Sequence, residues 1–273
     1  MFQYAFFFVA GLVFGLANVI PGVSGGTMAV VFGIYERLIG LIANFRTQWK
    51  KDLGFIIPLG LGAGIAILAF GKVMDWVLTY YPALANSFFV GVIIGSLPML
   101  FQKAWRTAKG AWKIRVSNIL PMLVTLGIML WMTFTTPAEA AAAEVVFGLG
   151  TALKMLLFGA VATACMIIPG ISGSFVMVML GAYSIVINAI ANLNFLLLAP
   201  FALGALIGLF GCAKLIRFLL KKYEMATYSA ILGFVIGSIP AVFPGFGAMS
   251  IGAVICLIAG VAAIVLCNKF SAE

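Results

Sequence analysis

The sequence contains no histidine, and only 8% of its 273 residues are charged, whereas 64% are hydrophobic. The absence of histidine removes imidazole-based catalysis and the commonest metal ligand. An ordinary globular chain is about 25% charged, so this chain lacks the polar surface that a soluble domain of its length requires. The four cysteines have no CxxC spacing. We therefore expect no metal site, no cofactor and no soluble enzyme.

The chain instead contains long apolar runs. Crossing the hydrocarbon core of a bilayer takes about 20 apolar residues per helix, and runs of this kind lie at 56–70, 149–168 and 251–267. The net charge is +9, but no basic patch with interleaved aromatic residues lies on a soluble segment, which argues against nucleic acid as a partner. The pattern predicts an all-α polytopic membrane protein whose positive loops face anionic lipid headgroups.

The chain contains an internal repeat. PGVSGGTMAVVFGIY, which begins at Pro21, shares seven of 15 residues with PGISGSFVMVMLGAY, which begins at Pro169, at an offset of 148. Two further matches, both at an offset of 142, pair the segments that begin at Pro58 and Pro200 and the segments that begin at Phe89 and Ile231. Because the three matches are collinear, we interpret the chain as two repeats, at 1–136 and 137–273.

Each repeat contains five apolar segments. In the first repeat we place them at 4–20, 25–43, 55–74, 86–101 and 117–136. In the second repeat we place them at 147–168, 174–192, 196–216, 229–242 and 249–267. The first two segments of each repeat predict a re-entrant or interrupted helical hairpin, and the other three predict transmembrane helices.

Basic residues set the orientation, because lysine and arginine mark cytoplasmic loops. Fourteen of the 16 basic residues follow the second, fourth, eighth and tenth segments, and the loop from Lys103 to Arg115 alone holds five. The loops that contain Glu139 and Glu144 are neutral or acidic. Three net crossings per repeat invert the second repeat relative to the first and predict that both termini are cytoplasmic. Many secondary transporters have this architecture, with the site at the repeat interface.

A PG-x-SG element interrupts each hairpin and provides the candidate ligand-binding groups. Proline lacks a backbone donor and disfavours helix at the preceding residue, so we expect new helices to start near Ser24 and Ser172. Free amides and the positive end of a helix dipole suit an anion. The alternative is a tight structural turn in which the serines cap the helices. The predicted anion site contains these residues: Pro21, Gly22, Ser24, Gly25, Gly26, Thr27, Pro169, Gly170, Ser172, Gly173 and Ser174.

Other polar residues near the two elements have two interpretations each. Asn18 would contact a ligand or brace the loop. The repeat-matched Tyr35 and Tyr183 would contribute to the site or lie at the membrane interface, and Arg37 would contact a headgroup or anchor the loop. Two more matched residues, Lys72 and Lys214, would snorkel to the surface or capture an anionic headgroup on opposite leaflets.

The stretch from Gly11 to Arg37, GLVFGLANVIPGVSGGTMAVVFGIYER, resembles the signature of the PopT-type polyprenyl-phosphate transporters, a bacterial and archaeal membrane family. The second element, PGISGS, also fits, so the resemblance covers most of the chain. It implies a flippase that returns undecaprenyl phosphate or a related lipid carrier from the outer to the cytoplasmic leaflet of the cytoplasmic membrane. It carries over Asn18, Tyr35 and Glu36 besides the loop residues. Ser174 and Phe175 replace the Gly26 and Thr27 of the first copy, so we expect two unequal half-sites.

Three alternatives remain beside the lipid transporter. A transporter of a small soluble anion would use the same loops but would need a closed aqueous cavity. A membrane lipid phosphatase is disfavoured because the chain has no histidine and few acids. A structural subunit is disfavoured because unwound backbone at membrane depth is costly. The sequence leaves open the coupling ion, proton or sodium, and a homo-oligomeric assembly.

Overall fold

The computed structural model describes residues 2–19, 24–106, 110–112, 115–135 and 148–271, and these residues are almost entirely helical, with no strand among them. The elements are α1 (Phe2–Val19), α2 (Gly25–Val31), α3 (Tyr35–Ala43), α4 (Phe45–Gln48), α5 (Leu53–Tyr80), α6 (Pro82–Trp105), α7 (Val116–Thr135), α8 (Leu149–Ile167), α9 (Gly173–Met179), α10 (Tyr183–Ala191), α11 (Phe195–Lys222), α12 (Glu224–Val242), the 3-10 helix η1 (Phe246–Ala248) and α13 (Ile251–Ser271). The all-α fold predicted from the sequence is confirmed.

The helices suit a bilayer. Five of those described, α6, α7, α8, α11 and α12, are long and apolar enough to cross a membrane, and α9 with α10 would add a sixth if the pair forms one bent span. Their outer faces are apolar: Leu149, Leu153 and Leu157 lie one turn apart on α8 and are 81%, 55% and 59% exposed. A soluble protein rarely exposes such a continuous apolar stripe. The protein is therefore a multi-pass membrane protein.

Small residues bring α1 and α5 into close, parallel contact. A Cβ atom at Gly11 would lie 2.3 Å from the carbonyl oxygen of Leu59, and one at Gly15 would lie 2.5 Å from that of Ala63. The step of four residues in both helices shows that they run in the same direction. Glycines spaced in this way permit backbone contact between membrane helices.

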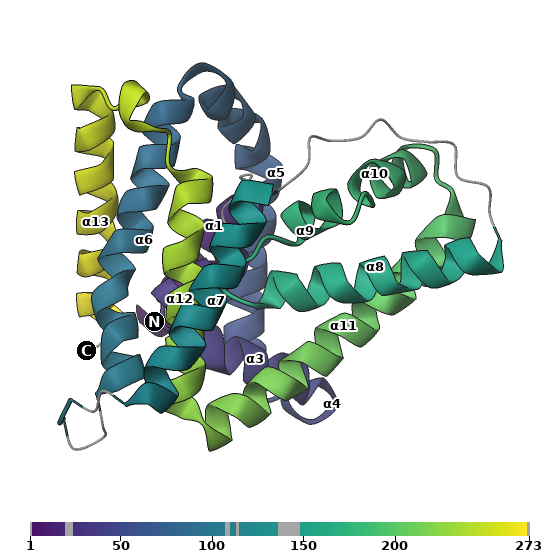
Figure 1. Ribbon diagram of the computed structural model, residues 1–273, viewed down its shortest axis with the longest axis horizontal. Coiled ribbons are helices and arrows are strands. Elements are labelled where there is room, and N and C mark those ends of the chain that lie inside the picture. Colours follow the sequence, from purple (N-terminus) through teal and green to yellow (C-terminus); the bar gives the residue numbers. More distant parts are fainter. Residues whose placement is uncertain (1, 20–23, 107–109, 113–114, 136–147, 272–273) are drawn as a thin grey trace.

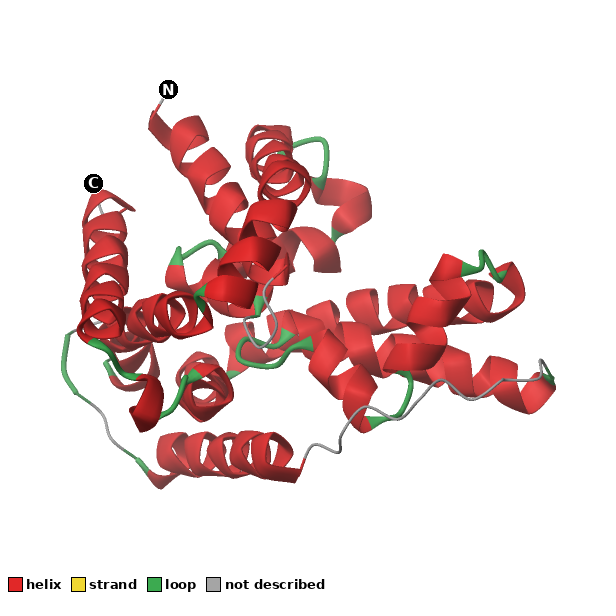
Figure 2. Ribbon diagram, turned by 90° about the horizontal axis from the view of Figure 1, so that it is seen from above, coloured by secondary structure: helices red, strands yellow, loops and turns green. Residues whose placement is uncertain are grey.

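The pair α8 and α11 repeats this packing in the second half of the chain. Cβ atoms at Gly204 and Gly208 would lie 1.9 and 2.1 Å from the carbonyl oxygens of Leu156 and Ala160. The pair, together with α9 and α10, projects to one side of the bundle that α6, α7, α12 and α13 form (Figures 1 and 2). In both halves the chain therefore returns to its starting side before the next long helix begins, as the hairpin prediction requires.

The remaining long helices pair across the two halves. α6 runs parallel to α13, with Gly91 against Leu257 and Gly95 against Val261, and α7 packs along α12. α6 and α12 hold equivalent places in the helix order but run in opposite directions (Figure 1). This arrangement supports an inverted repeat, and the division at residues 136 and 137 stays a prediction.

The apolar segments predicted at 25–43 and 174–192, the second of each hairpin, are both interrupted. Each is split into two short helices, α2 with α3 and α9 with α10, and the second pair bends by 113°. The physical reason is a glycine at the break: Gly33 has a φ of +67° and Gly181 a φ of +66°. This backbone conformation suits glycine because it has no Cβ. The two glycines match in the repeat.

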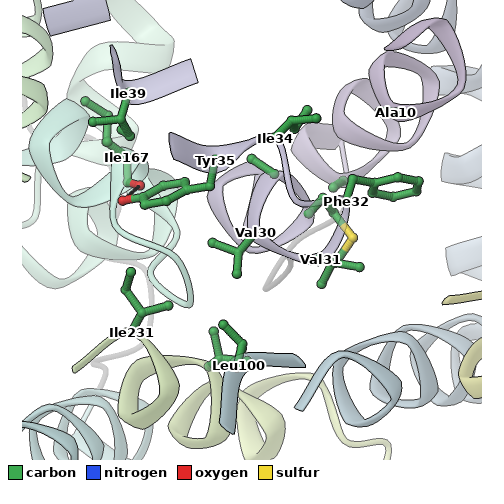
Figure 3. Packing of buried hydrophobic residues seen from close by; sticks show 14 of the residues in the cluster. Ala10, Val30, Val31, Phe32, Ile34, Tyr35, Ile39, Leu100, Ile167 and Ile231 are labelled. Atoms are coloured by element: carbon green, nitrogen blue, oxygen red, sulfur yellow. Dashed lines mark hydrogen bonds between the residues drawn. The ribbon is translucent and has the colours of Figure 1, made fainter. Parts of the chain in front are cut away.

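The largest hydrophobic core surrounds the first hairpin. All seven residues of α2 are buried. Its apolar residues share one core cluster with side chains from α1, α6, α8 and α12, including Ala10, Leu100, Ile167 and Ile231 (Figure 3). In α9, by contrast, only Gly173 and Val176 are buried. The short helix that follows the first PG-x-SG element is therefore buried throughout, whereas the short helix that follows the second is buried only in part.

Candidate functional site

Both short helices begin where the sequence predicts. Ser24 is the N-cap residue of α2 and Ser172 is the N-cap residue of α9, and both have extended backbone. Neither serine side chain makes a capping hydrogen bond. The structural alternative, in which the serines serve as helix caps, therefore lacks the hydrogen bond that defines a cap.

The two elements touch each other, although 143 residues separate the contacting groups. The amide of Gly170 donates a hydrogen bond of 2.7 Å to the hydroxyl of Thr27, and both residues are buried. A Cβ atom at Gly26 would lie 3.0 Å from the carbonyl oxygen of Ile167, just before the second element. The repeat thus brings the two loops together. Pro21 and Gly22 lie outside the described residues.

The Ser24 hydroxyl is a buried polar group without a partner. Ser24 is 5% exposed, and its Oγ has no hydrogen-bond partner among the described residues. An unpaired buried hydroxyl is costly, and such groups are usually satisfied by protein, water or a ligand. The first amides of a helix also lack intrahelical acceptors. The start of α2 therefore combines a free hydroxyl with backbone donors, which is chemistry that an anion can satisfy.

Asn18 lies against the start of α2. Its Nδ2 donates a 2.7 Å hydrogen bond to the carbonyl oxygen of Phe14, one turn earlier in α1. The same Nδ2 would lie 2.5 Å from a Cβ atom at Gly25. The lack of a side chain at Gly25 thus makes room for Asn18, and whether Asn18 contacts a ligand stays a prediction.

The second loop depends on Gly170. This residue is buried and has a φ of +91°, and a Cβ atom there would lie 2.6 Å from the carbonyl carbon and oxygen of Phe234 on α12. The hydroxyls of Ser172 and Ser174 lie 2.8 Å apart and share a hydrogen bond. The expected amide donor at Gly170 is paired with Thr27, so the second loop offers the hydroxyls and the first amides of α9 instead.

The two matched tyrosines differ in their surroundings. Tyr35 is 2% exposed, and its hydroxyl donates a 3.3 Å hydrogen bond to the carbonyl oxygen of Ile167 (Figure 3). Tyr183 is only half-buried. Tyr35 therefore lies inside the protein, where it ties the first hairpin to the end of α8.

Glu36 belongs to a charged cluster beside the hairpin. Lys103 Nζ on α6 lies 2.8 Å from Glu36 Oε1 and 2.9 Å from the hydroxyl of Tyr228 on α12, and that hydroxyl donates a hydrogen bond to the same carboxylate. Glu36 lies on α3, outside the candidate spans. Burial raises the pKa of its carboxyl, but the hydrogen bonds from Lys103 and Tyr228 and the charge of Lys103 lower the pKa further, to below its ordinary value.

Sequence reasoning did not identify Lys103 and Tyr228 as site residues. Lys103 begins the basic loop and was interpreted only as a sign of topology, and Tyr228 lies 192 residues from Glu36. The available signal was a lysine two residues after the predicted segment 86–101, together with an acid, Glu36, directly after the first motif.

Arg37 is engaged within the protein. Its guanidinium donates hydrogen bonds of 2.6 and 3.1 Å to Asp52, and it lies 4.7 Å from the ring centre of Phe55 and 5.1 Å from that of Phe7. This arrangement fits the anchoring role and leaves less of the guanidinium for a lipid headgroup.

The two matched lysines lie on equivalent helices. Lys72 lies in α5, where its side chain is outside the described part of the structure, and Lys214 is exposed on α11. Their role in headgroup capture stays a prediction. Among the described residues, no three histidine, cysteine, aspartate or glutamate side chains form a cluster that could hold a metal ion.

The chain thus belongs to the class of helical membrane proteins in which two broken hairpins meet in the interior. The profile of the undecaprenyl phosphate translocase-like family matches residues 14–255, and the chain is a member of that family.

Two curated relatives, from Vibrio cholerae and Staphylococcus aureus, are each named polyprenyl-phosphate transporter. The first is 29% identical over 256 residues, which are 89% of this chain and 78% of the relative. The second is 29% identical over 245 residues, which are 86% of this chain and 84% of the relative. No solved structure matches the chain.

Proposed function

We propose that this chain transports a polyprenyl phosphate, undecaprenyl phosphate or a related carrier lipid, from the outer to the cytoplasmic leaflet of a bacterial or archaeal cytoplasmic membrane. It carries out this movement without catalysing a reaction. The family and the names of the two relatives support the lipid, and the observation that carries the site is the contact between the two PG-x-SG loops beside the unpartnered hydroxyl of Ser24.

The charged headgroup is the part of the lipid that is hardest to move across the bilayer. A charged group at the centre of a bilayer is costly unless protein groups replace its hydration. Ser24 and the first amides of α2 offer donors inside the bundle, and Ser172 and Ser174 add hydroxyls from the second loop. The lipid tail needs no polar path, because the outer faces of the helices are already apolar.

The bond between Thr27 and Gly170 defines the state in which the loops are in contact. A phosphate held between both loops replaces this bond and gains the Gly170 amide and the Thr27 hydroxyl as ligands. A phosphate held by the first loop alone leaves it intact. The proposed transport cycle therefore alternates between loops joined to each other and loops joined through the headgroup.

The direction of transport and the orientation belong to the same proposal. The concentration of lysine and arginine in four connections supports cytoplasmic termini and a cytoplasmic loop between α6 and α7. Inverted repeats in secondary transporters expose one site alternately to the two sides. The helix directions of α6 and α12 support that mechanism here.

Reconstitution tests the proposal. Purified protein in liposomes that carry a fluorescent polyprenyl phosphate should speed exchange of the lipid between leaflets, measured by the access of a soluble quencher. A matched polyprenyl alcohol should show no acceleration, because it lacks the phosphate. If the protein moved a soluble anion such as inorganic phosphate but not the lipid, the transporter of soluble anions would be the correct assignment.

A further inference from the structure

A second group of polar side chains lies where α2 ends and α3 begins. A pocket between α2, α3, α6 and α12 is lined by Val30, Gly33, Tyr35, Glu36, Met99, Lys103 and Tyr228. Its polar groups are the ammonium of Lys103, the hydroxyl of Tyr228 and the carboxylate of Glu36. An ammonium and a hydroxyl directed at one carboxylate form a set of donors for an anion.

Glu36 already occupies the position of that anion. Its Oε1 accepts hydrogen bonds from both donors, and Lys103 also lies 4.7 Å from the ring centre of Tyr228. The side chain of Glu36 is 51% exposed and that of Lys103 is 35% exposed. Ion pairs with this degree of exposure are weak, so the charge of the carboxylate contributes little at Lys103. The hydroxyl of the buried Tyr228 can donate to a competing anion in place of the carboxylate.

We propose that Lys103 and Tyr228 form a second phosphate site and that the Glu36 carboxylate fills it until a phosphate monoester takes its place. This inference deepens the proposed function, on which it rests for the identity of the lipid. The headgroup, arriving from the two loops or from the cytoplasmic leaflet, displaces Glu36 from Lys103 and takes over its two donors. The side chain of Glu36, which is already half-exposed, then turns away from the pocket.

The position of the pocket links it to the loops. Glu36 follows Tyr35, whose hydroxyl is bonded to the carbonyl oxygen of Ile167, two residues before Pro169 of the second element. A displacement at Glu36 therefore acts on the same short helix that ties the first hairpin to the second loop. Binding of a phosphate at Lys103 and Tyr228 can thus favour release of the headgroup from the two loops.

Binding measurements on full-length protein test the exchange, with inorganic phosphate and a short-chain polyprenyl phosphate as separate probes. Glu36→Gln keeps the shape but removes the competing charge, so it should tighten binding about two- to fivefold. Lys103→Gln removes the charged donor and should weaken binding about tenfold or more. In the Lys103→Gln background, Glu36→Gln should have no further effect.

Asp52→Asn is the matched control, because it removes the acid of the neighbouring ion pair and should leave affinity unchanged. Glu36→Ala serves as a second variant if the glutamine form does not fold. The inference is overturned if Glu36→Gln fails to tighten binding, if it does so without Lys103, or if Asp52→Asn has the same effect. Lys103-dependent tightening for inorganic phosphate, with no binding of the lipid probe, would uphold the exchange and contradict the proposed lipid.

Discussion

Thr27→Val breaks the hydrogen bond that joins the two loops while changing the shape of the side chain little. In the native protein the Gly170 amide donates to the Thr27 hydroxyl at 2.7 Å. Valine fills almost the same space but offers no acceptor. The Gly170 amide is buried, so the substitution leaves a donor without a partner inside the protein.

The expected cost follows from that burial. An unsatisfied buried donor costs about 1–3 kcal/mol, whereas hydrogen bonds measured between membrane helices average only about 0.6 kcal/mol. Gly170 cannot easily turn toward another acceptor, because the backbone of Phe234 lies against it. We therefore expect Thr27→Val to lower the free energy of unfolding by about 1–3 kcal/mol.

Ser24→Ala provides the contrast. The Ser24 hydroxyl lies one helical turn from Thr27 and is equally buried, but it has no partner among the described residues. Its removal should not lower the free energy of unfolding, because it takes away an unsatisfied buried hydroxyl and leaves no other group without a partner. Reversible unfolding of both variants in mixed micelles, followed by tryptophan fluorescence, gives the comparison. Equal stability of Thr27→Val and wild type, or an equal loss in Ser24→Ala, would refute the role assigned to the bond.

Three further predictions concern binding, folding and topology. Ser24→Ala should weaken polyprenyl-phosphate binding by about 1.5–3 kcal/mol, the value of a hydrogen bond to a charged group, as measured by titration of the purified protein; unchanged affinity would return Ser24 to a purely structural role. Gly170→Ala should destabilise the protein more than Gly33→Ala, because both residues have positive φ but only Gly170 also meets the backbone of Phe234; thermal unfolding of the two variants gives the order. A cysteine placed at Lys109 should resist an impermeant external reagent in intact cells, and its labelling there would contradict the predicted cytoplasmic loop.

The sequence predicts most of the fold because the fold depends on apolar length and on repetition. The expected segments at 117–136 and 147–168 correspond to α7 and α8 within two residues at each end. The breaks at Gly33 and Gly181 were missed, because an isolated glycine in an apolar run does not show whether its φ is positive. Each of these glycines lies two residues before the tyrosine that ends the repeated motif, and that shared position was the available signal.

The site is only partly predictable for a different reason. Serine and glycine at a helix start indicate an anion site locally, so Ser24 and Ser172 could be found from the motif. The partners of Glu36 could not, because Lys103 and Tyr228 come from other helices and their approach depends on how α3, α6 and α12 pack. The same holds for Thr27 and Gly170, whose contact requires both halves to be folded.

The position of the bound headgroup tests the central claim most directly. An experimental structure of the protein with polyprenyl phosphate in a lipid nanodisc should place the phosphate within hydrogen-bond distance of Ser24 and the first amides of α2. It should also place the tail along the apolar outer face of the helices. A phosphate bound away from both PG-x-SG loops and from Lys103 would contradict the proposed site and leave the loops with a structural role alone.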